Sequence, residues 1–270
     1  MLYLKSDIKI EKVKEMVKTH AELQVGCYFT NIESCATGQL CTSKFIDDYY
    51  WNLLSGFTEK EASNLIEDSL KCFDLRKRNQ SFYLDPSNYD EIQQKEFEER
   101  GFLLEKEIWM TVLEKRNAES IDGFVIEDVD KKKSVDFLRI FSVAFGGEAT
   151  ENDGYGDIPS SYLDALRNSI DGNSYKNVKH KHYIGYYNGE AVGCASVHIG
   201  EKYAGLYNVG VLPKYRKKGI GAVLSLHAIN EADKIGVDKI FFQTQPGGSV
   251  QRFYESLGCG VIFEAIIAYK

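Results

Sequence analysis

A basic turn that contains two glycines, lying between a strand pattern and a helix pattern, is the part of this sequence best suited to chemistry. Residues 207–221 read Tyr-Asn-Val-Gly-Val-Leu-Pro-Lys-Tyr-Arg-Lys-Lys-Gly-Ile-Gly. After Gly219 the apolar residues recur at intervals of three and four, as in a helix with one buried face. The first amides of a helix have no acceptor within it, and the helix dipole is positive there. The sequence therefore predicts a phosphate-binding turn, in which Gly219 and Gly221 let an anion approach the backbone.

This turn differs from two well-known phosphate motifs. It has no Gly-Lys-Ser/Thr ending that would place a hydroxyl on magnesium, and it lacks the three-glycine dinucleotide fingerprint. Arg216-x-x-Gly219-x-Gly221 resembles instead the pyrophosphate-binding motif of the GNAT (GCN5-related N-acetyltransferase) superfamily. The resemblance extends to the strand pattern 208–213 and to the distal Phe-Tyr-Glu-Ser-Leu-Gly of 253–258, and its elements follow in the family's order. The alternative is a tight helix-start turn that holds no ligand.

The resemblance implies acetyl-CoA as the acyl donor and assigns roles to residues of this chain. Main-chain donors of the strand at Val209 and Val211 would polarise the thioester carbonyl. Tyr254 matches the family tyrosine that gives a hydrogen bond or a proton to the departing thiolate, although its ring could simply pack beside Phe253. The pyrophosphate would be held by backbone amides of Arg216, Lys217, Lys218, Gly219, Ile220 and Gly221.

The group that takes the proton from an amine acceptor is left unassigned. A lysine-like amine has a pKa of roughly 10.4, so a carboxylate or an ordered water normally removes its proton. Many GNAT proteins place a glutamate on the central strand, but residues 205–211 contain none. Asn208 could position a water. A lone strand histidine such as His198 is expected to be structural.

The acceptor is expected to be an amine of a small molecule or a peptide. Four carboxylates crowd the loop 146–157 with no lysine or arginine among them, and they would attract a polyamine, an aminoglycoside or a basic peptide end. A solvated acidic loop is the equally weighted alternative. The four residues are Glu148, Glu151, Asp153 and Asp157.

Composition narrows the class of protein. The chain has 270 residues, a formal net charge of −7 and a pI of about 5.4, which argues against nucleic acid as a partner. No run of apolar residues is long enough for a membrane span, and no signal-peptide pattern is present, so we expect a cytoplasmic protein. The six cysteines show no Cys-x-x-Cys spacing, and Cys27, Cys35 and Cys41 have no histidine nearby in sequence, so no metal site is expected.

The predicted fold is α+β, with two GNAT-like domains, each a twisted, mostly antiparallel mixed sheet flanked by helices. We expect the acetyltransferase domain at 121–270 and a degenerate GNAT-like domain at 1–117, because the end of the pattern repeats at a period of about 157 residues. In the first half, Ser-Gly-Phe-Thr at 55–58 replaces the basic turn, a helix begins at Thr58, and Phe97 stands where Tyr254 stands. Coincidental similarity of two α+β halves is the alternative.

The predicted strands of the second half are 121–129, 181–187, 191–199, 205–211, 239–244 and 260–269, and its predicted helices are 133–145, 159–170, 219–235 and 248–257. An Asn188-Gly189 hairpin is expected between the second and third strands. The interpretation we adopt is an acyltransferase that moves acetyl from acetyl-CoA to a primary amine by direct attack in a ternary complex. One alternative is a transferase for a longer acyl chain, which acyl-pocket residues around Cys259 and the strand 239–244 would determine. The other is an acyl-CoA-binding module without turnover. Whether two copies form a homodimer is left open.

Overall fold

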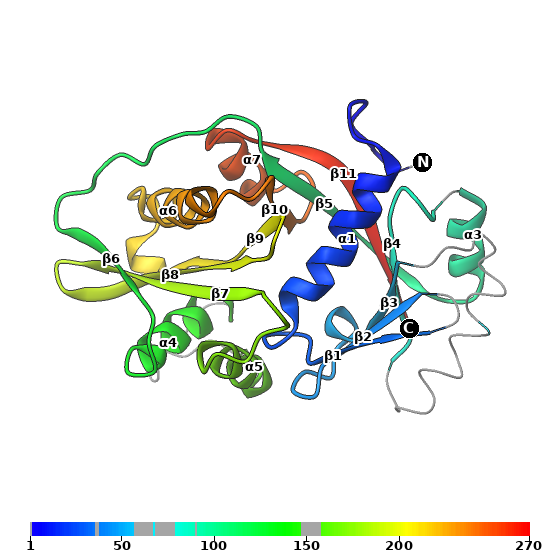
Figure 1. Ribbon diagram of the computed structural model, residues 1–270, viewed down its shortest axis with the longest axis horizontal. Helices are drawn as coiled ribbons and strands as arrows, with labels where there is room; N and C mark the ends of the chain where they lie inside the picture. The colour runs from blue at the N-terminus through cyan, green and yellow to red at the C-terminus, as the bar shows by residue number, and fades with distance from the viewer. Residues whose placement is uncertain (1, 36–37, 57–66, 68–78, 90, 147–157) are drawn as a thin grey trace. The chain divides into compact units, whose positions relative to one another are not determined.

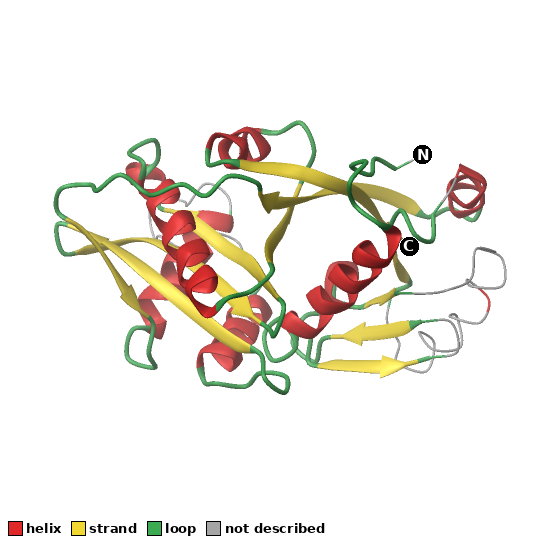
Figure 2. Cartoon of the chain, turned by 45° about the horizontal axis from the view of Figure 1, so that its top comes forward, coloured by secondary structure: helices red, strands yellow, loops and turns green. Residues whose placement is uncertain are grey.

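The computed structural model describes residues 2–35, 38–56, 67, 79–89, 91–146 and 158–270. These residues form two compact units. Unit 1 comprises Met1–Leu113 together with Gln243–Lys270, and unit 2 comprises Glu114–Phe242. Each unit combines helices with a mixed sheet, so the predicted α+β class is confirmed (Figure 2).

Unit 2 contains a sheet in the order β10-β9-β8-β7-β6. The β9–β10 pair is parallel and the other pairs are antiparallel. The strands and helices predicted for 121–244 are confirmed, with ends that differ by a few residues at most. Its elements are β6 Phe124–Asp128, α4 Ser134–Phe145, α5 Ser160–Ile170, β7 Lys179–Tyr187, β8 Glu190–Ile199, β9 Tyr203–Val211, the 3₁₀ turn η2 Pro213–Tyr215, α6 Ile220–Ile235 and β10 Lys239–Thr244, whose last two residues belong to unit 1.

Helices cover both faces of this sheet. Figure 1 shows α6 on one side and α4 with α5 on the other. A side chain at Gly193 of β8 would meet Leu224 of α6, and a side chain at Gly210 of β9 would meet Ala144 of α4, so the absence of a Cβ allows each helix to lie close to its strand. The predicted hairpin joins β7 and β8, with φ of 49° at Asn188 and 82° at Gly189, as a type I′ turn requires.

Unit 1 contains a sheet in the order β1-β2-β3-β4-β11-β5. Its first four strands pair as β7 to β10 do, because β1–β2 and β2–β3 are antiparallel and β3–β4 is parallel. The internal repeat predicted from the sequence is therefore present in the topology. The elements are α1 Ile10–Gln24, β1 Asn31–Ser34, β2 Gln39–Thr42, η1 Tyr49–Trp51, β3 Leu53–Ser55, β4 Ser81–Leu84, α3 Glu91–Glu99, β5 Leu103–Val112, α7 Ser249–Ser256 and β11 Cys259–Tyr269.

The two units differ from the expected domains 1–117 and 121–270 at the C-terminal end. Residues from Gln243 onward, including the strand expected at 260–269, belong to the first unit. The reason is that β11 lies between β4 and β5, paired antiparallel with both. Its apolar run 261–268 is interrupted only by Glu264, the pattern of a strand covered on both faces.

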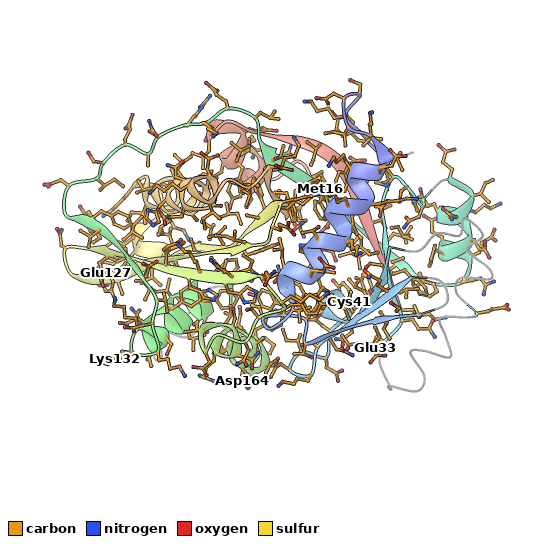
Figure 3. The ribbon with its side chains drawn as sticks, in the orientation of Figure 1. Met16, Glu33, Cys41, Glu127, Lys132 and Asp164 are labelled. Atoms are coloured by element: carbon orange, nitrogen blue, oxygen red, sulfur yellow. The ribbon has the colours of Figure 1, made fainter. Side chains whose placement is uncertain are left out.

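The core of unit 1 includes Phe97, whose counterpart in the repeat, Tyr254, has a predicted catalytic role. Phe97 is completely buried, with its ring centroid 5.2 Å from those of Phe82 and Phe102. The expected helix at Thr58 lies outside the described residues. Of the residues labelled in Figure 3, Met16 and Cys41 are buried in unit 1, whereas Glu127 and Lys132 are exposed on unit 2. Among the described helices, none has the length and hydrophobicity to cross a bilayer.

Candidate functional site

The basic turn between β9 and α6 has an unusual backbone. Pro213 begins η2, and the amide of Arg216 donates to the carbonyl of Pro213 at 3.2 Å. Lys217 and Gly219 then adopt left-handed conformations, with φ of 61° and 81°. A lysine in this region is uncommon, and alternation of left- and right-handed residues turns successive N–H groups toward one concave side.

Six consecutive amides of this turn donate no hydrogen bond to a described residue. The first bond of α6 runs from the amide of Val223 to the carbonyl of Gly219 at 3.1 Å. Within the described part of the chain, no hydrogen bond has an amide of residues 217–222 as its donor. The predicted set of donors therefore changes by one position, because the Arg216 amide is already bonded and the Ala222 amide is open.

The turn is also positively charged. Lys214, Lys217 and Lys218 are exposed, and none of them forms an ion pair with a described residue. The Lys218 Nζ lies 5.5 Å from the ring centroid of Tyr187 and 5.3 Å from that of Tyr215. Cation–π contacts orient this ammonium without neutralising it. Amides without a described acceptor, a helix N-terminus and lysines without a described ion-pair partner are features that favour the binding of a polyanion.

The side chain of Arg216 supports the turn from behind. Its guanidinium donates to the carbonyl of Val211 at 3.1 Å and to the carbonyl of Ala144, at the end of α4, at 3.2 Å. Both acceptors are backbone atoms, so this arginine connects the turn to β9 and to α4. The structure thus gives Arg216 a scaffolding contact that the sequence did not predict.

One edge of β9 has no strand partner beyond its middle among the described residues. The described pairs with β10 run from Tyr203↔Lys239 to Gly205↔Phe241 and include no later residue of β9. The amide of Leu212 donates to Val192 of β8 at 2.9 Å, and backbone groups alternate in direction along a strand. The main-chain groups of Val209 and Val211 are therefore directed away from β8, toward the open edge.

A β-bulge at Asn208 interrupts the pairing of β9 with β8. Tyr207 pairs with Ser196 and Gly210 with Cys194, so β9 has one residue more than β8 in this interval. Asn208 has a φ of 56°, and its carbonyl accepts from the Cys194 thiol at 3.3 Å. Burial raises the pKa of that thiol to about 12, so it keeps its proton. The Asn208 Nδ2 donates to Ser196 Oγ at 3.0 Å.

The predicted site residues fall into both units. The turn, Asn208, Val209 and Val211 lie together in unit 2, whereas Tyr254 belongs to α7 of unit 1. Tyr254 is 8% exposed, and its ring lies edge-on to Phe253 with centroids 4.9 Å apart. Its predicted role at the sulfur stays a prediction. The acidic residues Glu148, Glu151, Asp153 and Asp157 lie outside the described residues.

Sequence reasoning missed a polar network beneath the bulge. It considered His198 alone, whereas the structure brings His180 and His182 of β7 against Ser169 at the end of α5 and Ser196 of β8. The His180-x-His182 spacing was the available signal, because residues two apart on a strand share one face. The described residues include no group of three His, Cys, Asp or Glu side chains arranged to hold a metal.

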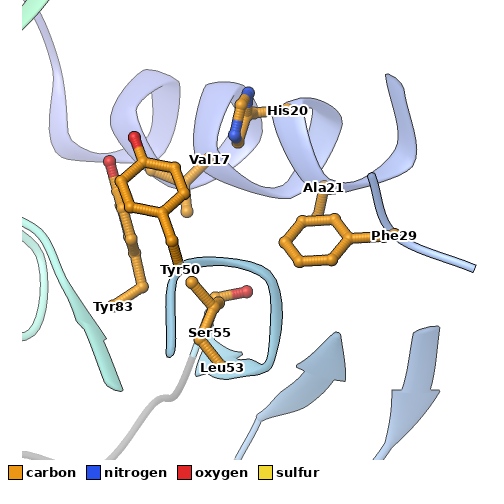
Figure 4. Close-up of a pocket in the computed structure, with 8 residues that line it drawn as sticks. All are labelled: Val17, His20, Ala21, Phe29, Tyr50, Leu53, Ser55 and Tyr83. Atoms are coloured by element: carbon orange, nitrogen blue, oxygen red, sulfur yellow. The ribbon is translucent and has the colours of Figure 1, made fainter. Parts of the chain in front are cut away.

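Unit 1 has a separate polar cluster beside a small cavity. The cavity of about 20 Å³ is lined by residues of α1, η1, β3 and β4, including His20, Tyr50 and Tyr83, and has room for one water-sized group (Figure 4). The hydroxyls of Tyr50 and Tyr83 both donate to the buried Glu107 carboxyl. Burial raises the pKa of Glu107, and these hydrogen bonds oppose the rise. The described contacts indicate a structural cluster.

Comparison with known proteins identifies the domain type. Residues 148–259 match the family model described as Acetyltransferase (GNAT) family. No functionally curated protein is significantly similar in sequence. Among solved structures, a GCN5-related N-acetyltransferase from Kribbella flavida is similar with a TM-score of 0.66 at 15% identity, over 93% of this chain and 94% of that chain.

Two further structures extend the similarity. A functionally unknown conserved protein from Staphylococcus epidermidis ATCC 12228 gives a TM-score of 0.67 at 15% identity, over 90% of this chain and 94% of that one. A tandem GNAT protein from the clavulanic acid biosynthesis pathway gives a TM-score of 0.56 at 11% identity, over 77% of this chain and 69% of that chain. At these identities the similarity shows the fold, and it includes the N-terminal half.

Proposed function

We propose that this protein is an N-acetyltransferase, because residues 148–259 match the GNAT family model and the fold of the chain is GNAT-like in both halves. It moves the acetyl group of acetyl-CoA to a primary amine of a small molecule or a peptide. The observation that carries the proposal is the run of six open amides at residues 217–222, beside three exposed lysines that have no described ion-pair partner.

The turn fits a diphosphate on physical grounds. Hydrogen bonds from amides to a charged acceptor contribute roughly 1.5–3 kcal/mol each. The left-handed Gly219 has no side chain between its amide and a bound anion, and an added Cβ would lie 3.4 Å from Ile121 while straining the backbone. The amides of Lys217 to Ala222 would hold the two phosphates, and the lysines would raise the association rate of the anionic cofactor.

The open edge of β9 supports the next part of the proposal. Main-chain groups of Val209 and Val211 would pair with the pantetheine amides and polarise the thioester carbonyl. The amine nitrogen forms a bond to the carbonyl carbon, and the carbon–sulfur bond then breaks. The amine loses one proton to a water positioned at Asn208, and the thiolate receives one from the Tyr254 hydroxyl, which is a general-acid role.

The test combines binding and turnover on the full chain. Calorimetric titration with acetyl-CoA should show binding, and thiol release should accelerate when a panel of polyamines, aminoglycosides and basic peptides is added. Binding without acceleration by any amine would favour the acyl-CoA-binding module. No binding at all would overturn the proposal at its first step.

A further inference from the structure

A continuous chain of hydrogen bonds crosses the interior of unit 2 from β7 to the bulge of β9. Ser169 Oγ lies 2.7 Å from His180 Nδ1 and 2.9 Å from His182 Nε2. On its other side, His182 Nδ1 lies 2.8 Å from Ser196 Oγ. Ser196 Oγ in turn accepts from Asn208 Nδ2 at 3.0 Å. Four elements, α5, β7, β8 and β9, each contribute to this chain.

The donor and acceptor capacities of these groups set the direction of the hydrogen bonds. An amide nitrogen can only donate, so Ser196 Oγ is an acceptor toward Asn208. The hydroxyl hydrogen of Ser196 is then available to His182 Nδ1, which accepts it. The neutral imidazole therefore has its hydrogen on Nε2 and donates it to Ser169, and the Ser169 hydroxyl donates to His180. In this arrangement each hydroxyl accepts once and donates once.

The surroundings of His182 keep it neutral. It is 4% exposed, and its ring lies edge-on to Phe137 with centroids 5.2 Å apart. Burial, and secondarily the neighbouring His180, lower the pKa of His182 to about 3. The hydrogen-bond chain requires a neutral imidazole, in which one ring nitrogen donates and the other accepts. Ser169 and Ser196 are buried as well, so water does not compete for these bonds.

We propose that His182, acting through Ser196, is a positioning residue for Asn208 in the acetyl transfer. The hydrogen-bond chain holds the Asn208 carboxamide with Nδ2 toward Ser196. This orientation determines which way Oδ1 faces at the bulge. An amide oxygen has two lone pairs, and Oδ1 serves as the acceptor for the N–H of the incoming amine or for the O–H of the water beside it. This inference rests on the proposed function and adds residues of β7 and β8 to the same site.

A double-mutant cycle tests the coupling. Ser196→Ala and Asn208→Ala should each lower kcat about tenfold, the scale of one lost hydrogen bond, and leave the KM for acetyl-CoA unchanged. Because Ser196 acts through Asn208, the double variant should be no slower than Asn208→Ala alone. Losses that multiply to about a hundredfold would overturn the inference, and so would a changed KM for acetyl-CoA with unchanged kcat.

A matched control is available in the same unit. Ser225 of α6 is fully buried and loses the same single oxygen in Ser225→Ala. That variant should keep the wild-type kcat. An equal loss in Ser225→Ala would mean that removing any buried hydroxyl of unit 2 slows the enzyme, and would contradict a specific path to Asn208.

A second measurement does not depend on turnover. Imidazole ¹⁵N shifts of the five histidines, assigned with His182→Gln, should show His182 protonated on Nε2 alone at neutral pH. Protonation on Nδ1 would reverse the direction of the hydrogen-bond chain and overturn the inference, even if the alanine variants fail to fold. Failure of the proposed function is distinct, because it would appear as absence of wild-type turnover with every amine while the tautomer stays as described.

Discussion

The guanidinium of Arg216 donates to the carbonyl oxygen of Val211 at 3.1 Å, and so connects the basic turn to the last residue of β9. The same side chain reaches the carbonyl of Ala144 at 3.2 Å. The planar guanidinium can satisfy two fixed backbone acceptors at once, which a flexible ammonium does less well. The open amides of the turn and the open edge of β9 are therefore held in one arrangement before any ligand arrives.

Arg216→Lys should weaken acetyl-CoA binding about tenfold although the net charge is unchanged. The reason is that the bracing of the turn is lost while its positive potential remains. Calorimetric titration measures the effect. Arg167→Lys, on the exposed surface of α5, is the control and should bind as the wild type does. Unchanged affinity of Arg216→Lys would mean that the turn keeps its shape without this brace.

Gly219→Val should abolish acetyl-CoA binding. A β-branched residue is strained at a φ of 81°, and its side chain would stand where the phosphates approach the amides. Gly236, at the other end of α6, has a φ of 89° and is also exposed. Gly236→Val should therefore lose a similar amount of free energy of unfolding but keep its affinity for the cofactor. Equal binding by both variants would contradict the assigned site.

Tyr254→Phe should keep acetyl-CoA affinity and lower kcat by about 10²–10⁴, the range of general-acid assistance. The substitution removes one oxygen and keeps the ring that packs beside Phe253. Tyr28→Phe removes a hydroxyl from another buried tyrosine of unit 1 and should leave kcat unchanged. Wild-type turnover in Tyr254→Phe would exclude the acid role of Tyr254.

His182→Gln should change how stability depends on pH. The pKa of His182 is about 3 in the folded protein, against the ordinary histidine value of 6.5 that the unfolded chain should show. As the pH falls from 6.5 toward 3, the unfolded chain binds a proton at this residue and the folded protein does not, so the wild type loses stability. The free energy of unfolding of the wild type should fall relative to that of His182→Gln by about 1.4 kcal/mol per pH unit in this range. Parallel curves from denaturant titrations at several pH values would contradict the neutral buried state.

The whole chain should bind one acetyl-CoA, in unit 2. Unit 1 has Ser55 and Gly56 in place of the basic turn, and Phe97 is part of its core. Calorimetry gives the stoichiometry directly, and a value of two would mean that unit 1 kept a cofactor site. A fragment of residues 1–117 should not fold by itself, because it lacks β11, the strand between β4 and β5.

Local sequence patterns were sufficient to predict most of the helices and strands of unit 2. The periodicity after Gly219 predicted α6, and the Asn188-Gly189 pair predicted the β7–β8 hairpin, because turn chemistry and helical amphipathicity are encoded within a few residues. In unit 1, α1, β1, β2 and β4 were not predicted. The predicted repeat of about 157 residues aligns the segment 50–54 with 207–211, but in the structure this segment is divided between η1 and β3. Short strands carry weak periodic signals, so their assignment depends on their partners.

By itself, the sequence determined the basic turn before a helix, since the glycines, the helix start and the group of lysines are all adjacent along the chain. It also determined the internal repeat, which follows from the order of elements. Only the tertiary structure decided that β11 joins the first unit, that Arg216 braces β9 and α4, and that His182 lies beneath Asn208. Each of these depends on atoms brought together from distant parts of the chain, and no local spacing encodes such a contact.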